Sequence, residues 1–145
     1  MDYHIAVCDD CAADADFAAD CAAQWAQRLG YTAEILRFPS AEAFLFQYAE
    51  DKRCDILLLD VEMPGLNGVE LAKRIRQKNK ALQIVFITGY TDYIAEGYDV
   101  SALHYLVKPV SREKLFCVLD RAAERLHSAA RTLLLGLPGG TGRVP

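Results

Sequence analysis

The sequence alternates short apolar runs with longer segments of helical period, and this alternation limits the possible folds more than any other feature. Four runs are nearly continuous in Ile, Val, Leu and Phe, as strands covered on both faces should be; they are residues 4–8, 55–59, 83–88 and 103–107. A fifth run, residues 31–38, alternates apolar with polar side chains, so we place it at a sheet edge. Strands separated by helices indicate βαβ units and a parallel sheet.

The segment between the first two runs predicts a long helix. Its large apolar side chains recur at steps of four, which suggests a single buried face; they are Phe17, Cys21, Trp25 and Leu29. Gly30 follows directly and suits the left-handed position that commonly ends a helix. We therefore expect the first helix to end at Gly30.

Four further helices are predicted along the rest of the chain. Ser40 suits the N-cap of the first of them, and Ser111 suits the start of the last. Residues 68–78 and 91–98 predict the two between. The last helix carries an apolar stripe at helical spacing, formed by Leu115, Val118, Leu119, Ala122 and Leu126.

The length and charge of the chain exclude several classes of function. A chain of 145 residues is about one domain and needs no disulfide or metal to hold a core. With 16 basic against 20 acidic residues the net charge is -4, which gives no long-range attraction for nucleic acid. No apolar run approaches the ~18 to 20 residues of a membrane-spanning helix, and no secretory signal begins the chain. We therefore expect a cytoplasmic protein.

The five cysteines are an odd number and lack the spacing of a disulfide framework or a zinc site. Cys8 and Cys11 have the spacing of a redox motif, but two aspartates fill the interval. We interpret Cys8 as a strand residue and Cys11 as a loop residue, and we expect all five thiols to be reduced.

The pattern changes after His127. Residues 131–137 predict a short apolar strand, and residues 138–142 a Gly-rich turn. We favour a hairpin turn over a phosphate-binding loop, because neither a Lys-Ser/Thr pair nor a helix follows it. We therefore assign residues 1–128 to one domain and residues 129–145 to a linker and the start of another.

Polar side chains follow the ends of four predicted strands. Asp9 and Asp10 follow the first strand and Asp60 the third, while Thr88 ends the fourth and Lys108 follows the fifth. Each has an ordinary structural explanation, such as a helix cap, a turn or a solvated lysine. In an open α/β sheet, however, the carboxyl ends of the strands form the ligand-binding edge. Three carboxylates gathered there repel one another unless a cation is present.

Mg²⁺ suits such a cluster, because it takes carboxylate and carbonyl oxygens and commonly bridges to a phosphoryl group. A phosphoryl group on one carboxylate would then be contacted by the metal, by the Lys108 ammonium and by the Thr88 hydroxyl. Asp60 is the natural nucleophile, because it ends the central strand between the other groups. The residues thus predict an aspartyl phosphate.

Four segments resemble the receiver domain of two-component response regulators: VCDD at 7–10, LLLDVEMPGLNG at 57–68, FITG at 86–89 and YLVKP at 105–109. The resemblance covers roughly residues 2–127. It implies a flavodoxin-like α/β fold, with a doubly wound five-stranded parallel sheet of order 2-1-3-4-5 and five flanking helices. It also implies a cis peptide before Pro109.

The resemblance assigns roles to individual residues. Asp60 matches the phosphoacceptor, and Asp9 and Asp10 match the acidic pair that holds Mg²⁺. The backbone carbonyl of Glu62 should complete the metal site. The remaining matches are Lys108 and Thr88, which contact phosphoryl oxygens, and Tyr105, the aromatic switch residue, for which a plain core tyrosine is the alternative.

The resemblance also implies partners. A sensor histidine kinase would supply the phosphoryl group, and a homodimer through the fourth helix, fifth strand and fifth helix is the family expectation. Residues 86–109 and the tail resemble receivers that precede LytTR-type DNA-binding domains, so we expect DNA contact only through an effector domain missing here.

Two other functions stay open on sequence grounds. A phosphorylation-independent interaction module would use the same fold without modifying Asp60. A phosphatase with an aspartyl nucleophile would use a general acid two positions later, where Glu62 stands. The second alternative leaves the Asp9–Asp10 and Lys108–Pro109 pairs unexplained.

Overall fold

The structure, a computed structural model, describes residues 2–89 and 101–135, with side chains up to Ser128. Its sheet has five parallel strands in the order β2-β1-β3-β4-β5, as the resemblance to receiver domains implied. Their bounds differ from the predicted runs by only a few residues: β1 (Asp2–Cys8), β2 (Thr32–Phe38), β3 (Ile56–Leu59), β4 (Gln83–Thr88) and β5 (His104–Val107). The alternating strand β2 lies at one edge, which confirms its placement.

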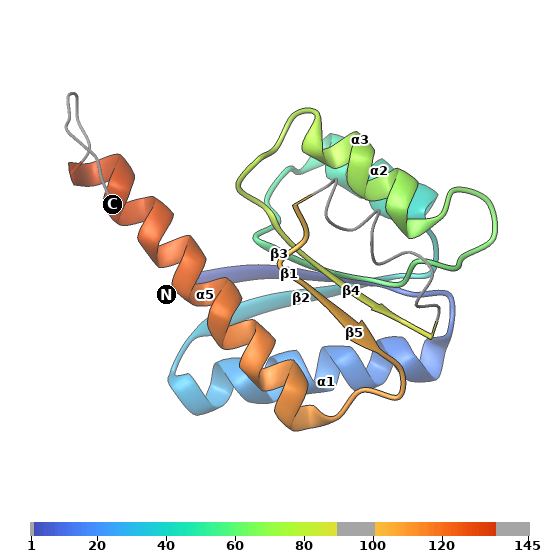
Figure 1. Ribbon diagram of the computed structural model, residues 1–145, viewed down its shortest axis with the longest axis horizontal. Helices are drawn as coiled ribbons and strands as arrows, with labels where there is room; N and C mark the ends of the chain where they lie inside the picture. The colour runs from blue at the N-terminus through green and yellow to red at the C-terminus, as the bar shows by residue number, and fades with distance from the viewer. Residues whose placement is uncertain (1, 90–100, 136–145) are drawn as a thin grey trace.

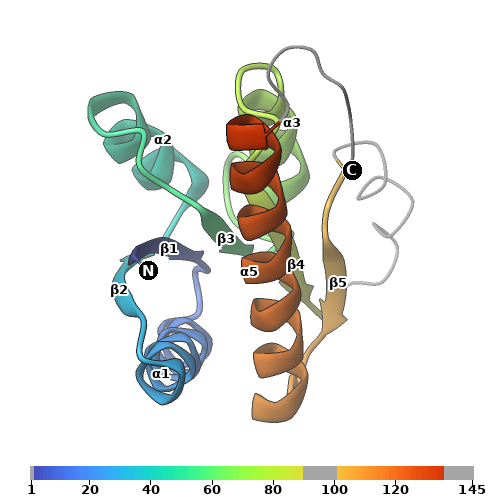
Figure 2. The same ribbon diagram turned by 90° about the vertical axis from the view of Figure 1, so that its left-hand side faces the viewer.

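Within the described residues, four helices cover the two faces of the sheet. They are α1 (Ala12–Leu29), α2 (Ala41–Glu50), α3 (Gly68–Arg76) and α5 (Arg112–Leu135). Helices α1 and α5 lie on one face, and α2 and α3 lie on the other (Figures 1 and 2). The predicted helix at residues 91–98 lies outside the described residues.

The sheet divides the core into two layers, and β3 shows why its sequence is apolar throughout. Ile56 and Leu58 pack into the layer under α1 and α5, whereas Leu57 and Leu59 pack into the layer under α2 and α3. All four side chains are at most 1% exposed. Because successive strand residues point to opposite faces, a strand covered on both sides needs an apolar residue at every position.

Helix α1 corrects the predicted buried face. Cys21 and Trp25 are buried as expected, but Phe17 and Leu29 are 37% and 49% exposed. Steps of four residues turn about 40° past a full helical turn, so a row of four such positions drifts across the helix surface. The two middle residues therefore face the core and the end residues do not. Alanines fill the remaining buried positions, namely Ala15, Ala18, Ala19, Ala22 and Ala26.

The helix ends follow the predicted signals. Gly30 adopts the left-handed conformation with φ 74° at the end of α1. The Ser40 hydroxyl accepts a hydrogen bond from the backbone N–H of Ala43, and the Ser111 hydroxyl accepts one from that of Lys114. These contacts satisfy backbone donors that the first turn of a helix leaves free.

The tail differs from its predicted strand where the structure describes it. Helix α5 continues to Leu135, so residues 131–135 are helical. Arginine and leucine are strong helix formers and dominate this stretch, and the helix extends past the sheet (Figure 1). Residues 136–145, including the predicted Gly-rich turn, lie outside the described residues.

Two further expectations concern membranes and thiols. Within the described residues, no helix is long and apolar enough to cross a bilayer. All five cysteines are free thiols, as predicted, with Cys8 and Cys21 buried and Cys11 and Cys117 exposed.

Candidate functional site

Backbone hydrogen bonds between neighbouring strands continue past the strand ends and fix the backbone positions of the site residues. The N–H of Asp60 donates to the Cys8 carbonyl at 2.9 Å, and the N–H of Lys108 donates to the Thr88 carbonyl at 2.9 Å. Asp9 is tied to β2 in the same way, through the Phe38 carbonyl at 3.0 Å. The predicted residues therefore start from backbone positions held by the sheet, at its carboxyl edge.

Three of the predicted residues form an acidic cluster. Carboxylate oxygens of Asp9, Asp10 and Asp60 all lie within 4.8 Å of one another. Asp9 and Asp60 are buried at 7% and 6% exposure, whereas Asp10 is exposed. The Asp60 Oδ1 atom is buried and has no hydrogen-bond partner within the described part of the chain.

This cluster fits a hard divalent cation. Buried polar atoms are nearly always satisfied, so the orphaned Asp60 oxygen calls for a partner. Mg²⁺ is bound by one or two carboxylates together with waters, and an exposed third carboxylate beside them suits a water-mediated contact. Asp9, Asp10 and Asp60 together therefore supply the donor set that the ion needs.

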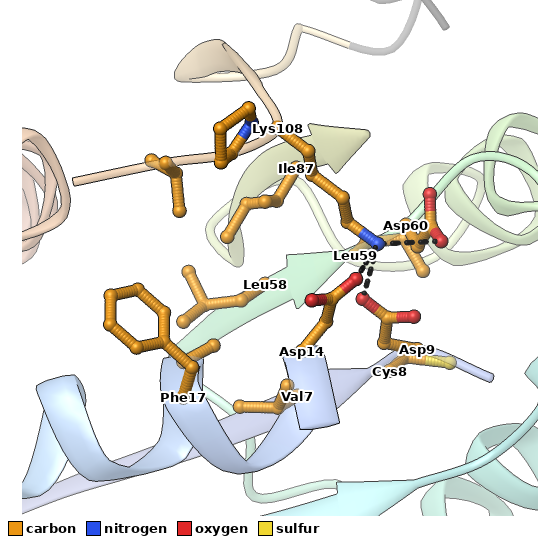
Figure 3. Close-up of a pocket in the computed structure, with 13 residues that line it drawn as sticks. Val7, Cys8, Asp9, Asp14, Phe17, Leu58, Leu59, Asp60, Ile87 and Lys108 are labelled. Carbon is orange, nitrogen blue, oxygen red and sulfur yellow. Dashed lines mark hydrogen bonds and ion pairs between the residues drawn. The ribbon is translucent and has the colours of Figure 1, made fainter. Parts of the chain in front are cut away.

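The Lys108 ammonium lies against this cluster and contacts three carboxylates (Figure 3). Its Nζ atom is 2.9 Å from Asp9 Oδ2 and 3.2 Å from Asp60 Oδ2. It is also 2.8 Å from Oδ2 of Asp14, which stands in the first turn of α1. The second Asp9 oxygen accepts the backbone N–H of Cys11 at 2.9 Å.

The pKa values of Asp9 and Lys108 are both raised, but for different reasons. Burial raises the pKa of Asp9 above its usual value, and the hydrogen bonds from Lys108 and Cys11 offset only part of that effect. Burial lowers the pKa of Lys108, but Asp14, Asp9 and Asp60 outweigh it and hold that pKa above its ordinary value. Lys108 is therefore charged at neutral pH.

The remaining predicted residues differ in how deeply they are buried. Thr88 ends β4 and is fully buried, while Glu62 is exposed. Tyr105 is half-buried, with its ring centroid 5.9 Å from that of Phe86. The Lys108–Pro109 peptide is cis, as predicted.

The loop between β3 and α3, which carries Glu62, is held from two sides. The Glu42 carboxylate of α2 accepts the backbone N–H of Leu66 at 2.9 Å, and Gly65 takes φ 78° beside it. At the start of α3, Asn67 and Glu70 form a reciprocal capping box. This loop is therefore anchored to both neighbouring helices.

A cavity of about 330 Å³ adjoins the acidic cluster on the side of α1 (Figure 3). Asp9, Asp14, Asp60 and Lys108 form its polar side. The rest of its lining is mostly apolar and includes Val7, Phe17, Ala18, Leu58, Ile87, Pro109 and Val110. The charged groups thus form the polar wall of this cavity at the carboxyl edge of the sheet.

The sequence reasoning missed Asp14. It considered only residues that directly follow strands, whereas Asp14 reaches the site from a helix. A signal was present: Asp14 stands four residues after Asp10, in the first turn of the helix that leaves the site. An acidic residue in that first turn lies close to the edge of the sheet that carries Asp9 and Asp10.

Together, the strand order and the acidic edge define a doubly wound α/β protein with an aspartate-rich site and one lysine. A family model for the response regulator receiver domain matches residues 5–120. The chain belongs to that family. Receiver domains bind Mg²⁺ at an acidic pocket, act as phosphorylation switches and partner with sensor histidine kinases.

Relatives and solved structures agree with this assignment. The chain is 34% identical over 99 residues to the sensory transduction protein LytT of Oceanobacillus iheyensis, a match covering 66% of this chain and 40% of that protein. It is 40% identical over 80 residues to the positive alginate biosynthesis regulatory protein of Pseudomonas aeruginosa, covering 54% and 32%. The chain thus spans less than half the length of these relatives.

The fold is shared with receiver domains of known structure. The REC domain of AraT from Geobacillus stearothermophilus superposes with a TM-score of 0.77 at 24% identity, covering 90% of this chain and 99% of that one. The response regulatory domain of mrkE from Klebsiella pneumoniae gives 0.76 at 21%, covering 86% and 98%.

Proposed function

We propose that this chain is a phosphorylation-activated switch in which Asp60 accepts a phosphoryl group from a sensor histidine kinase. The observation that carries the proposal is the position of the Asp60 carboxylate. It is buried, it lies within 4.8 Å of two further aspartates, it touches Lys108, and one of its oxygens lacks a hydrogen-bond partner among the described residues.

The proposed metal site uses Asp9, Asp10, Asp60 and the backbone carbonyl of Glu62. Bound Mg²⁺ would supply the positive charge that offsets the oxygens of the incoming group. Burial of Asp9 and Asp60 strengthens this attraction, because water screens it less. The anchored loop between β3 and α3 supports the assignment of Glu62, since it limits how far that backbone can move.

In the transfer itself, a carboxylate oxygen of Asp60 attacks the phosphorus atom and forms the new P–O bond. The donor's P–N bond breaks, and its electron pair returns to the imidazole of the kinase histidine. Lys108 and Thr88 contact the phosphoryl oxygens, so the ammonium and the hydroxyl stabilise charge that the transfer brings in.

The switch follows from the added charge. Phosphorylation brings roughly -1.5 to -2 charge to Asp60, and Thr88 follows the new acceptor. Tyr105 then changes its packing against Phe86 at the surface of β5. The half-buried position of Tyr105 suits such a change, because its ring needs no exit from a closed core.

The surface of β5 and α5 is the proposed site of homodimer formation, together with the predicted fourth helix. Val107 is 46% exposed there, and a cleft of about 400 Å³ runs along both elements. The test is the solution mass with and without beryllofluoride. A monomer under both conditions would remove this part of the proposal.

The signal is proposed to pass to a LytTR-type DNA-binding domain of a cytoplasmic regulator, with residues 129–145 as the linker and the start of that domain. The likeness to LytT and the share of that protein covered by this chain support this arrangement. Fusing α5 to such a domain and measuring DNA binding with and without phosphorylation tests it. Binding that ignores phosphorylation would refute it.

The phosphoacceptor is tested by incubating the chain with acetyl phosphate and Mg²⁺ and measuring its intact mass. We expect the mass of one phosphoryl group to be added to the wild type and to Asp16→Asn, which changes an exposed carboxylate outside the site. No addition is expected in Asp60→Asn or without Mg²⁺. Equal labelling of the wild type and Asp60→Asn would refute the proposal, and an unlabelled wild type would favour a phosphorylation-independent module.

A further inference from the structure

The shortest of the three Lys108 ion pairs is made with a residue that the proposed function does not use. Lys108 Nζ lies 2.8 Å from Asp14, against 2.9 Å from Asp9 and 3.2 Å from Asp60. An ammonium has three N–H donors, and three carboxylates surround this one. Two of these carboxylates, Asp9 and Asp60, accept hydrogen bonds from Lys108, and Asp14 forms the third ion pair, so Lys108 has to weaken one of these contacts to approach a phosphoryl oxygen.

The three carboxylates differ in how easily they release Lys108. Asp9 and Asp60 side chains are each 7% exposed, so water cannot readily replace the ammonium beside them. The Asp14 side chain is 46% exposed and can be solvated at once. Exposed ion pairs are weak for this reason. Asp14 is the partner that Lys108 can leave at least cost.

We propose that Asp14 is a positioning residue that competes with the phosphoryl group for Lys108. The inference rests on the phosphoacceptor function proposed above. In the unphosphorylated protein Asp14 draws the ammonium toward α1, and that contact breaks when Lys108 moves to the phosphoryl oxygen. Asp14 thereby weakens the hold of the site on the phosphoryl group.

The same contact has the opposite effect on the metal. Lys108 and Mg²⁺ both bind Asp9 and Asp60, so they compete for these oxygens. While Asp14 occupies part of the ammonium's bonding capacity, Lys108 screens the acidic pair less, and Mg²⁺ binds more tightly. Loss of the Asp14 charge should therefore weaken metal binding while it strengthens binding of the anion.

The first experiment compares Asp14→Asn with Asp16→Asn. Both substitutions remove one carboxylate charge from α1, but Asp16 pairs with Arg37 at 2.9 Å and does not contact Lys108. Calorimetry at saturating Mg²⁺ measures beryllofluoride binding. We expect Asp14→Asn to bind it about threefold to fivefold more tightly than the wild type, the effect of one partly exposed ion pair. We expect Asp16→Asn to match the wild type.

The second experiment asks whether Asp14 acts through Lys108. Mg²⁺ affinity is measured for the wild type, Asp14→Asn, Lys108→Met and the double variant, which form a double-mutant cycle. We expect Asp14→Asn to weaken Mg²⁺ binding about twofold to threefold when Lys108 is present. In the Lys108→Met background its effect should fall to that of Asp16→Asn.

Two results would overturn the inference. One is beryllofluoride binding by Asp14→Asn that is no tighter than by Asp16→Asn. The other is an equal loss of Mg²⁺ affinity in both Lys108 backgrounds, which would show a long-range charge effect. Failure of the proposed function looks different, because the wild type would then bind no beryllofluoride.

Discussion

A methyl group added at Gly68 should disturb the phosphoacceptor without touching its side chain. Gly68 is the first residue of α3, and its N–H donates to the Val61 carbonyl at 2.8 Å. A Cβ atom built there would fall inside van der Waals contact of the Asp60 carbonyl oxygen and 2.9 Å from the Val61 Cα. Both neighbours are backbone atoms, so no side-chain rotation can relieve the clash.

Whether Gly68→Ala raises or lowers the free energy of unfolding shows whether these close backbone contacts matter. Alanine is a better helix former than glycine by up to ~1 kcal/mol, so an open site would tolerate or favour Gly68→Ala. Overpacking that forces backbone shifts costs typically about 1 to 3 kcal/mol. We expect a lower free energy of unfolding by about that amount, and weaker Mg²⁺ binding because the Asp60 backbone has moved.

Gly89→Ala is the matched control. Among the described residues, a Cβ atom there has no neighbour within 4 Å, although Gly89 also adjoins a site residue, Thr88. Urea unfolding of the three proteins gives the free energies, and calorimetry gives the Mg²⁺ affinities. We expect Gly89→Ala to change stability by less than about 0.5 kcal/mol. A Gly68→Ala protein as stable as the wild type would refute the reasoning.

Three further predictions concern other parts of the molecule. In the native protein at pH 8, Ellman's reagent should react fast with the exposed thiols of Cys11 and Cys117 and slowly with Cys8, because burial raises the pKa of Cys8 to about 12; five fast thiols without denaturant would contradict this. Burial also raises the pKa of Tyr3 from 10.0 to about 12, so its contribution to stability is complete below pH 10 and is lost as the pH rises through 12. Tyr3→Phe should reduce the fall in melting temperature over that interval, and an unchanged fall would assign it to other groups. Asn67→Ala removes a capping box and should cost about 1 kcal/mol in urea unfolding, whereas Asn67→Asp should retain most of that stability; equal loss in both would show that the cap contributes little.

Much of the fold could be predicted because the nearly continuous apolar sequences of β3 and β4 indicate strands that are buried on both faces. The edge position of β2 could be predicted from its alternation, for the same reason. The orientation of α1 could not, because its alanines carry little hydrophobic signal while Phe17 and Leu29 carry much. The large residues therefore predicted a buried face that includes Phe17 and Leu29, whereas the alanines lie on the face that is buried. The end of α5 was missed because a leucine run suits a strand and a helix equally.

The acidic site could be predicted to the extent that strands place it. Asp9, Asp60 and Lys108 follow strands whose register fixes their neighbours, so adjacency in the sheet becomes adjacency of side chains. Asp14 could not be placed this way. Its distance from Lys108 depends on where the first turn of α1 lies over the carboxyl edge, and sequence spacing alone does not determine that.

The groups around Asp60 therefore also differ in how freely they can move, because Asp9 and Lys108 start from the sheet and Asp14 starts from a helix. Asp9 and Lys108 start from backbone bonded into the sheet, and moving either one breaks hydrogen bonds that the neighbouring strands share. Asp14 stands on the first turn of a helix, with its side chain half in water, and it can release Lys108 without disturbing a strand. A substitution at Asp14 should therefore tune the affinity of the site while the fold stays intact. Substitutions at Asp9 or Lys108 leave buried charge without its partner, which costs stability as well as function.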